Sequence, residues 1–345
     1  MGKRLDCASV QRRASRLPRS ASAADLILPL PADWVAAAAA LLSLSHVTRS
    51  QSDVSLRTTL AETFLAAGES LIISEQVGWK PIGRFSLQSM PGAQPVEPSP
   101  HAVRGALIRS GRILAIYPSA ASEGQSLACF VARRQGHGPA RQQRQFRQKL
   151  RSGQRFCSVG PLCWKELEQE GLAVNRAALA ARRSNHRSWC RPEPWSRFCR
   201  ALARDPQMAV WGCRVQGRLA AFLLLWEQNR TAHGLALQWD PRLAWAHPTH
   251  CLYDGVLHGL FAEGRVEAVV AGRQTIPPRP DLDRFKRHAG FSAEPCSVRV
   301  VAHPLLAPWL RGRRQAAVLR RLTRAWPGLA DLEVLACACE QAVLP

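Results

Sequence analysis

The sequence contains AVWGCRVQGRLAAFLLLWE at residues 209–227, in which two apolar runs flank the dipeptide Gln216-Gly217. A polar residue followed by glycine between two apolar runs is typical of a tight β-hairpin turn. A second turn, at Asn229-Arg230, leads into a third apolar run at residues 233–240. Three strands joined by short turns predict an antiparallel meander.

Patterns on both sides of this meander extend it into a layered fold. A helix is predicted from Glu193, because Trp195, Phe198, Cys199 and Leu202 then lie on one side. Behind the meander we predict a helix at 248–262, a strand at 266–270, a short helix at 281–289 and a strand at 297–302. This order of elements predicts an α+β fold with a mixed, mostly antiparallel central sheet flanked by helices.

The first half of the chain has weaker patterns. We predict helices at 33–46 and 58–67, the second ended by Gly68, and strands at 71–73 and 127–132. Two apolar runs, Ala106–Arg109 and Arg112–Tyr117, are joined by Ser110-Gly111 and predict a hairpin. Residues 1–25 are rich in Arg and Ser and predict a disordered basic leader.

Composition limits the class of protein. The chain has 345 residues, 47 basic against 25 acidic side chains and 46% hydrophobic residues. Such a chain can bury a core, so wholesale disorder is excluded. No apolar run reaches the roughly 18 residues of a membrane span. The net charge of +22 indicates an attraction for phosphate-bearing ligands or a bias in codon usage.

The 11 cysteines include no Cys-x-x-Cys pair. Their scattered spacing indicates reduced thiols in a cytoplasmic protein rather than a disulfide framework. His247-x-x-His250 lacks a third ligand, so no metal site is expected.

Residues 124–165 contain no acidic side chain. A helix is predicted at 141–151, with Arg144, Arg147 and Arg151 on one face and Phe146 and Leu150 on another. The basic face suits phosphate groups of a substrate; the alternative is a solvated surface helix.

Two segments carry a resemblance to a known family. LDRFKRHAGF at 282–291 is similar to the Phe-Lys-x-x-x-Gly-Phe segment of Fem-type peptidyltransferases, and WGCRVQGRLAAF at 211–222 is similar to their strand, turn and Ala-Ala strand unit. The chain therefore resembles the FemAB-like and GNAT-like (GCN5-related) N-acyltransferases, which are bacterial proteins. The basic helix at 141–151 lies where those proteins carry an Arg/Lys-rich helix.

The resemblance implies a tandem of two copies of the fold. We expect a degenerate copy at 26–165, a well-formed acyltransferase domain at 166–305 and a helical tail at 306–345. It also implies that the central strands of the second copy splay apart to form the cleft for the acyl donor.

The resemblance assigns roles to particular residues. Lys286 falls on the Phe-Lys position and is expected in the active cleft, where it stabilises charge. Tyr253 is expected to protonate a leaving thiolate, and His250, on the same helix face, to act as a base; the alternatives are a core tyrosine and a structural histidine. Asp240 and Arg273 end predicted strands and are expected to bind the acceptor.

The expected reaction is transfer of an acyl or aminoacyl group from acyl-CoA, or from aminoacyl-tRNA, to a small amine or an acceptor resembling a peptidoglycan precursor. As the enzyme class, we expect transfer of a group other than an aminoacyl group. Family members that bind acyl-CoA carry a glycine loop before the main helix, whose N–H groups hold the pyrophosphate. Residues 240–250 contain no glycine here, so aminoacyl-tRNA stays open as the donor.

Two other readings stay open. The chain could be a basic nucleic-acid-binding protein or a non-catalytic member of the fold. Residues 309–326 also predict an amphipathic helix, which suits a peripheral membrane contact or packing on the domain.

Overall fold

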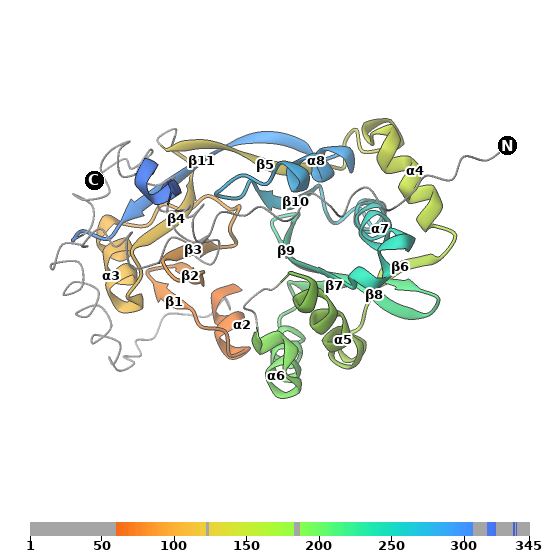
Figure 1. Ribbon diagram of the computed structural model, residues 1–345, viewed down its shortest axis with the longest axis horizontal. Helices are drawn as coiled ribbons and strands as arrows, with labels where there is room; N and C mark the ends of the chain where they lie inside the picture. The colour runs from red at the N-terminus through yellow and green to blue at the C-terminus, as the bar shows by residue number, and fades with distance from the viewer. Residues whose placement is uncertain are drawn as a thin grey trace, which may run out of the picture. The chain divides into compact units, whose positions relative to one another are not determined.

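The computed structural model describes residues 60–121, 124–182, 187–305, 316–321, 334 and 336, and Figure 1 shows their arrangement. The predicted basic leader and the predicted helix at 33–46 lie outside these residues. Of the predicted amphipathic helix at 309–326, only residues 316–321 are described, and they are helical.

The strands form one mixed sheet with the order β1-β2-β3-β4-β11-β5-β10-β9-β8-β7-β6. All neighbouring pairs are antiparallel except β3 with β4 and β10 with β9. The predicted α+β fold with a mostly antiparallel sheet is therefore confirmed. The strands are β1 (Ile72–Ser74), β2 (Val77–Ile82), β3 (Ser86–Met90), β4 (Leu114–Ser119), β5 (Gln125–Arg133), β6 (Cys157–Pro161), β7 (Met208–Val215), β8 (Arg218–Gln228), β9 (Thr231–Trp239), β10 (Ala268–Arg273) and β11 (Ser292–Ala302).

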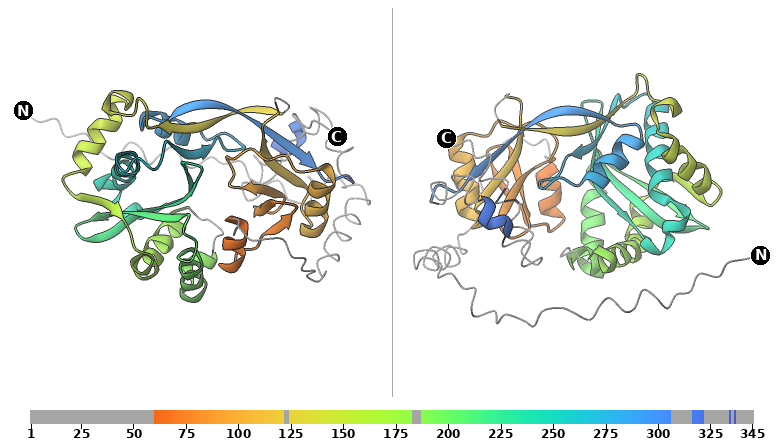
Figure 2. Two further views of the ribbon diagram at one scale, coloured as in Figure 1. Left: turned by 180° about the vertical axis from the view of Figure 1, so that it is seen from behind. Right: turned by 45° about the horizontal axis from the view of Figure 1, so that its top comes forward.

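Helices cover the sheet. They are α2 (Leu60–Ala66), α3 (Pro100–Ser110), α4 (Arg144–Gly153), α5 (Trp164–Arg182), α6 (Pro192–Leu202), α7 (Pro248–Ala262) and α8 (Pro280–His288). Figures 1 and 2 show α7 and α4 on one side of β6–β9, and α5 and α6 on the other. The predicted order from α6 through the meander β7–β9 to α7, β10, α8 and β11 is confirmed.

The core lies on both faces of the central strands. β8 is buried along most of its length, since its neighbours cover both of its sides and helices cover both of its faces. Trp195, Phe198, Cys199 and Leu202 of α6 are all buried, as the helical spacing predicted. On the opposite face, Leu252, Val256 and Leu257 of α7 pack into a second cluster.

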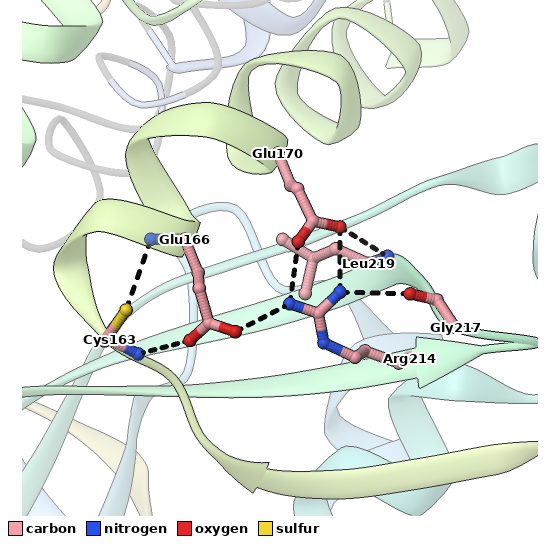
Figure 3. A network of polar contacts seen from close by, with 6 residues as sticks. All are labelled: Cys163, Glu166, Glu170, Arg214, Gly217 and Leu219. Atoms are coloured by element: carbon pink, nitrogen blue, oxygen red, sulfur yellow. Dashed lines mark hydrogen bonds and ion pairs between the residues drawn. The ribbon is translucent and has the colours of Figure 1, made fainter.

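Arg214 of β7 joins the sheet to the start of α5 (Figure 3). Its Nη2 lies 3.1 Å from Glu166 Oε1 and 2.7 Å from Glu170 Oε1. Glu170 also accepts a hydrogen bond from the backbone N–H of Leu219, at 3.2 Å. Hydrogen bonding holds the pKa of both carboxylates below the ordinary value. The largest cause is the hydrogen bond from the Cys163 backbone for Glu166 and the hydrogen bond from the Arg214 side chain for Glu170. One guanidinium thus fixes α5 over the β7–β8 hairpin.

The predicted hairpin at 106–117 is wrong in its first half. Residues 106–109 belong to α3, which begins at Pro100 after the cap Ser99, whose Oγ accepts from Ala102 N at 3.1 Å. Gly111 then ends the helix in the left-handed conformation, with φ +61°. Ser110-Gly111 is therefore a helix end rather than a strand turn, as glycine at this position commonly is. The second half forms β4 as predicted.

The last described strand of the sheet joins the two halves of the chain. β11 pairs with β4 over residues 297–302 and with β5 over 292–298. β6, which precedes residue 166, pairs with β7. Strand pairing therefore crosses the predicted boundary at 165/166 more than once, and the division into two copies stays a prediction.

Candidate active site

The parallel strands β9 and β10 separate near the middle of the sheet. They pair at only three positions, which end at Val270↔His233. Beyond that point β9 continues to Trp239 and β10 to Arg273. The strands therefore diverge, as expected for the donor cleft of the family.

A cavity of about 460 Å³ lies beside this divergence. Strand β9 contributes residues 233–236 to its wall, and β10 with the following loop contributes 270–276. Residues 80–93, from β2 to the loop after β3, form the facing wall, and Lys286 of α8 also lines the cavity. The cavity thus receives side chains from both halves of the chain.

Lys286 lies at the cavity next to a bulge in β10. The ladder with β5 is irregular between Val270 and Arg273, and Gly272 in this bulge has φ +83°. A Cβ at position 272 would lie 4.0 Å from Lys286 Nζ. The ammonium also sits 4.6 Å from the centre of the Phe130 ring. Glycine supplies the left-handed backbone of this bulge.

The Lys286 ammonium is poorly compensated. The residue is only 5% exposed, and no described carboxylate lies within ion-pair distance of it. Burial lowers the pKa of Lys286 to about 8, although Asp283 opposes the shift. At neutral pH the amine is therefore mostly charged and held close to its titration range.

Arg273 places a second cation at the cavity. Its Nε donates to Gly92 O at 3.1 Å and its Nη1 to Gln274 O at 3.1 Å. Burial lowers the pKa of Arg273. Gln274 Nε2 in turn donates to Asp283 Oδ2 at 2.8 Å. Asp283 is buried on α8, and its Oδ1 has no hydrogen-bond partner in the described chain.

Tyr253 and His250 lie in a different place, between α7 and α8. The Phe146 ring lies 4.9 Å from His250, and the Tyr253 ring lies 5.6 Å from Phe285. Burial raises the pKa of Tyr253 to about 12 and lowers that of His250 to about 4, so both are uncharged at neutral pH. Neither residue lines the cavity. Their predicted catalytic roles stay predictions.

Helix α4 covers the start of α7. A Cβ on Gly153, the last residue of α4, would lie 2.6 Å from both Ala246 O and Cys251 Sγ. Gln142, just before α4, donates from Nε2 to Asp254 Oδ1 at 2.6 Å. These contacts lie beside the start of α7, where the resemblance would place a pyrophosphate, and Thr249 of the first turn takes no part in them.

The three arginines on the basic face of α4 differ in their hydrogen bonds and in their exposure. Arg147 Nη1 donates to Pro139 O at 3.0 Å and to Gln142 O at 2.6 Å, so this residue braces the turn before the helix. Arg144 and Arg151 are exposed. None of the three lines the cavity.

Asp240 binds Arg242 and does not line the cavity. It is buried, accepts a hydrogen bond from Arg242 N at 3.0 Å and pairs with Arg242 Nη2 at 2.7 Å. Hydrogen bonding to the Arg242 side chain lowers the pKa of Asp240. It caps the short 3₁₀ helix Pro241–Ala246 instead of lining the cavity.

Sequence reasoning missed His233, Gly272 and Ser89 at the cavity. Burial lowers the pKa of His233 to about 4, and its Nδ1 and Ser89 Oγ lack hydrogen-bond partners in the residues described. A glycine inside a strand pattern is a known sign of a bulge, so Gly272 offered a signal. The position of His233 depends on the divergence of β9 and β10, which no local pattern shows.

Among the described residues, no three His, Cys, Asp or Glu side chains are grouped so that they could hold a metal ion. None of their helices is both long and apolar enough to cross a lipid bilayer.

Residues 140–287 match the family model described as the acetyltransferase (GNAT) domain. For these residues, the match confirms the GNAT-like resemblance read from the sequence. No curated protein matches the chain.

Solved structures with related folds share little sequence. "Crystal structure of FemX" is 10% identical, with 79% of this chain and 97% of that chain covered and a TM-score of 0.47. The C-terminal domain of a putative lysylphosphatidylglycerol synthetase from Agrobacterium fabrum is 12% identical (77% and 92% covered, TM-score 0.46). A tandem GNAT protein from the clavulanic acid biosynthesis pathway is 12% identical (66% and 78% covered, TM-score 0.39). These sequence identities and TM-scores are too low for the substrate of any of these proteins to be assigned to this chain.

Proposed function

We propose that this protein is an N-acyltransferase whose reaction takes place in the cavity beside β9 and β10. The observation that carries the proposal is the Lys286 ammonium, which is buried, unpaired by any described carboxylate and placed at the cavity wall. A buried charge without a partner is costly and is seldom kept without a use.

Acyl transfer to an amine builds negative charge on the carbonyl oxygen when the amine attacks. A fixed cation in a low-dielectric site stabilises this charge, and one such donor typically contributes 10²–10³-fold in rate. Lys286 supplies that cation, and Phe130 and Gly272 keep it in place. Its charge, rather than its ability to accept a proton, is what the reaction uses at neutral pH.

The acyl donor follows from the packing of α4. Gly153 packs against Ala246 and Cys251 beside the start of α7, and Phe146 packs against His250 and Phe285. A coenzyme A pyrophosphate at this helix start would have to fit beside these contacts. An aminoacyl-tRNA delivers its ester without using that helix start. This favours an aminoacyl donor over the acyl-CoA expected from the sequence. Arg144 and Arg151, exposed on α4, are available to its phosphates.

The test compares both donors on the same protein. Purified protein is incubated with acetyl-CoA or with aminoacyl-tRNA and a mixture of amines, and new amides are detected by mass spectrometry. We expect amide formation with aminoacyl-tRNA, and a loss of about 10²–10³-fold in Lys286→Met. The matched control is Arg284→Met, because Arg284 is an exposed cation on the same helix.

Two results would contradict the proposal. If neither donor forms an amide, the protein is not an N-acyltransferase for these donors. If Lys286→Met forms amide at a rate within tenfold of the wild type, Lys286 has no role in the reaction.

A further inference from the structure

The charged side chains described in the cavity wall are all positive. Its lining includes Lys80, Arg273 and Lys286, and no described Asp or Glu lines it. His233 adds no charge, because burial keeps its pKa at about 4. The described wall therefore presents only cations and neutral groups to whatever enters.

Lys80 differs from the other two cations. Its Nζ lies 3.5 Å from Glu69 Oε2 and 5.4 Å from the centre of the Phe64 ring, so it has partners of its own. Arg273 and Lys286 have no described ion-pair partner. Arg273 uses Nε and Nη1 on backbone carbonyls, which fixes its guanidinium and leaves Nη2 for a ligand.

The groups around Lys286 do not neutralise it. Asp283 is on the same helix, but its Oδ2 is engaged by Gln274. On β5, burial raises the pKa of Cys129 to about 11, so this thiol is uncharged at neutral pH. Arg273 on β10 adds positive charge. An anion in the cavity would relieve both cations together.

The same charges act on the acceptor amine. An amine attacks the carbonyl only when it is neutral, and nearby cations disfavour its protonated form. A simple cationic amine is therefore repelled, whereas an amine that also carries an anion is attracted by that anion. Apolar lining residues such as Ile116, Leu235 and Val270 suit the carbon chain between the two groups.

We propose that the acceptor is an anionic amine, whose carboxylate or phosphate is bound by Arg273 and by one N–H of Lys286 while its amine attacks the donor ester. The Lys286 ammonium has three N–H donors, so another of them serves the carbonyl oxygen. The inference rests on the proposed function. In the step, the amine nitrogen forms a bond to the carbonyl carbon and the carbon–oxygen ester bond breaks. The electron pair leaves with the ester oxygen, and the proton lost by the amine passes through water to that oxygen.

The test uses probes of equal length and needs no acyl donor. The probes are 6-aminohexanoate, 6-aminohexyl phosphate, the uncharged 6-aminohexanamide as a headgroup control and 1,6-diaminohexane, titrated into the full chain by calorimetry. We expect binding of the two anionic probes and at least tenfold weaker binding of the amide and the diamine. Stronger binding of the carboxylate or of the phosphate identifies which anion the site prefers.

Proton uptake gives a readout specific to Lys286. A bound anion raises the pKa of this amine above its value of about 8, so binding at pH 8 takes up about half a proton. The uptake is measured from the heats in two buffers of different ionisation enthalpy. Lys286→Met should take up about half a proton less than the wild type, a difference in which proton exchange by the probe's own amine cancels. Binding should weaken at least tenfold in Arg273→Gln and partly recover in Arg273→Lys. Arg284→Gln, an exposed cation on the same helix, should bind as the wild type does.

The outcomes separate this inference from the proposed function. Equal binding of the diamine and the anionic probes, or no binding of any probe together with acyl transfer to neutral amines, overturns the inference and leaves the acyltransferase standing. Binding of anionic probes with proton uptake, but without amide formation from either donor, supports the anion site and overturns the reaction.

Discussion

Replacing Lys286 by Met should make the protein more stable while it removes activity. A pKa of about 8, against the ordinary 10.5, corresponds to roughly 3.5 kcal/mol of cost for the buried ammonium at neutral pH, at ~1.4 kcal/mol per pH unit. Methionine keeps the apolar stem of the side chain and removes the charge. The lost contact with the Phe130 ring offsets about 0.5–2 kcal/mol.

The net gain at pH 7 is therefore about 1.5–3 kcal/mol in the free energy of unfolding, from the two magnitudes above. In a chain of this size it raises Tm by roughly 2–6 °C. Urea denaturation followed by fluorescence measures the free energy. Arg284→Met is the control, because an exposed cation without such burial should change stability by less than about 0.5 kcal/mol.

The pH dependence makes the reasoning refutable. Between pH 8 and 10.5 the folded protein binds fewer protons at Lys286 than the unfolded chain does, so this residue makes the wild type more stable as pH rises. The advantage of Lys286→Met should be full below pH 8 and shrink toward pH 10.5. A variant less stable than wild type at pH 7, or a difference that does not change with pH, would show that desolvation of this amine is not the cause.

Three further substitutions test other parts of the structure. Gly272→Ala places a Cβ on a residue with left-handed backbone, 4.0 Å from Lys286 Nζ. Urea denaturation should show a loss of about 1–2 kcal/mol in the free energy of unfolding, and amide formation should be slower than in the wild type. Arg214→Ala should cost about 1 kcal/mol, with a smaller loss at 1 M salt because screening already weakens the ion pairs there; an unchanged loss at high salt would contradict an electrostatic origin. Phe146→Ala should cost about 3–5 kcal/mol and Phe146→Leu clearly less, by calorimetry, if this ring fills the space next to His250.

Local patterns predicted the second half of the fold well. The meander β7–β9 and helix α7 have strong apolar periodicity and clear turn residues, so burial and local preference agree. The Ala106–Arg109 run was too short for its period to separate a strand from the end of a helix. Ser99, Pro100 and Gly111 decide that case, because they cap α3 at both ends.

The candidate site was predictable only in part. Lys286 stood out because its motif is local, and Arg273 because it ends a strand. The spacing placed His250 and Tyr253 on one helix face correctly, but spacing cannot say whether that face meets a cavity or another helix. Helix α4, with Phe146, fills the space in front of that face. His233 joins the site only through the parting of two strands.

The position of β11 has a consequence for synthesis of the chain. β4 and β5 follow each other in sequence, yet β11 lies between them. A ribosome must add about 160 residues after β5 before that gap can close, which takes roughly 10–30 s at about 5–20 residues per second. During that time the nascent chain presents unpaired strand edges on both β4 and β5. The first half of this protein therefore completes its sheet after translation of the second, and it depends on protection from aggregation until then.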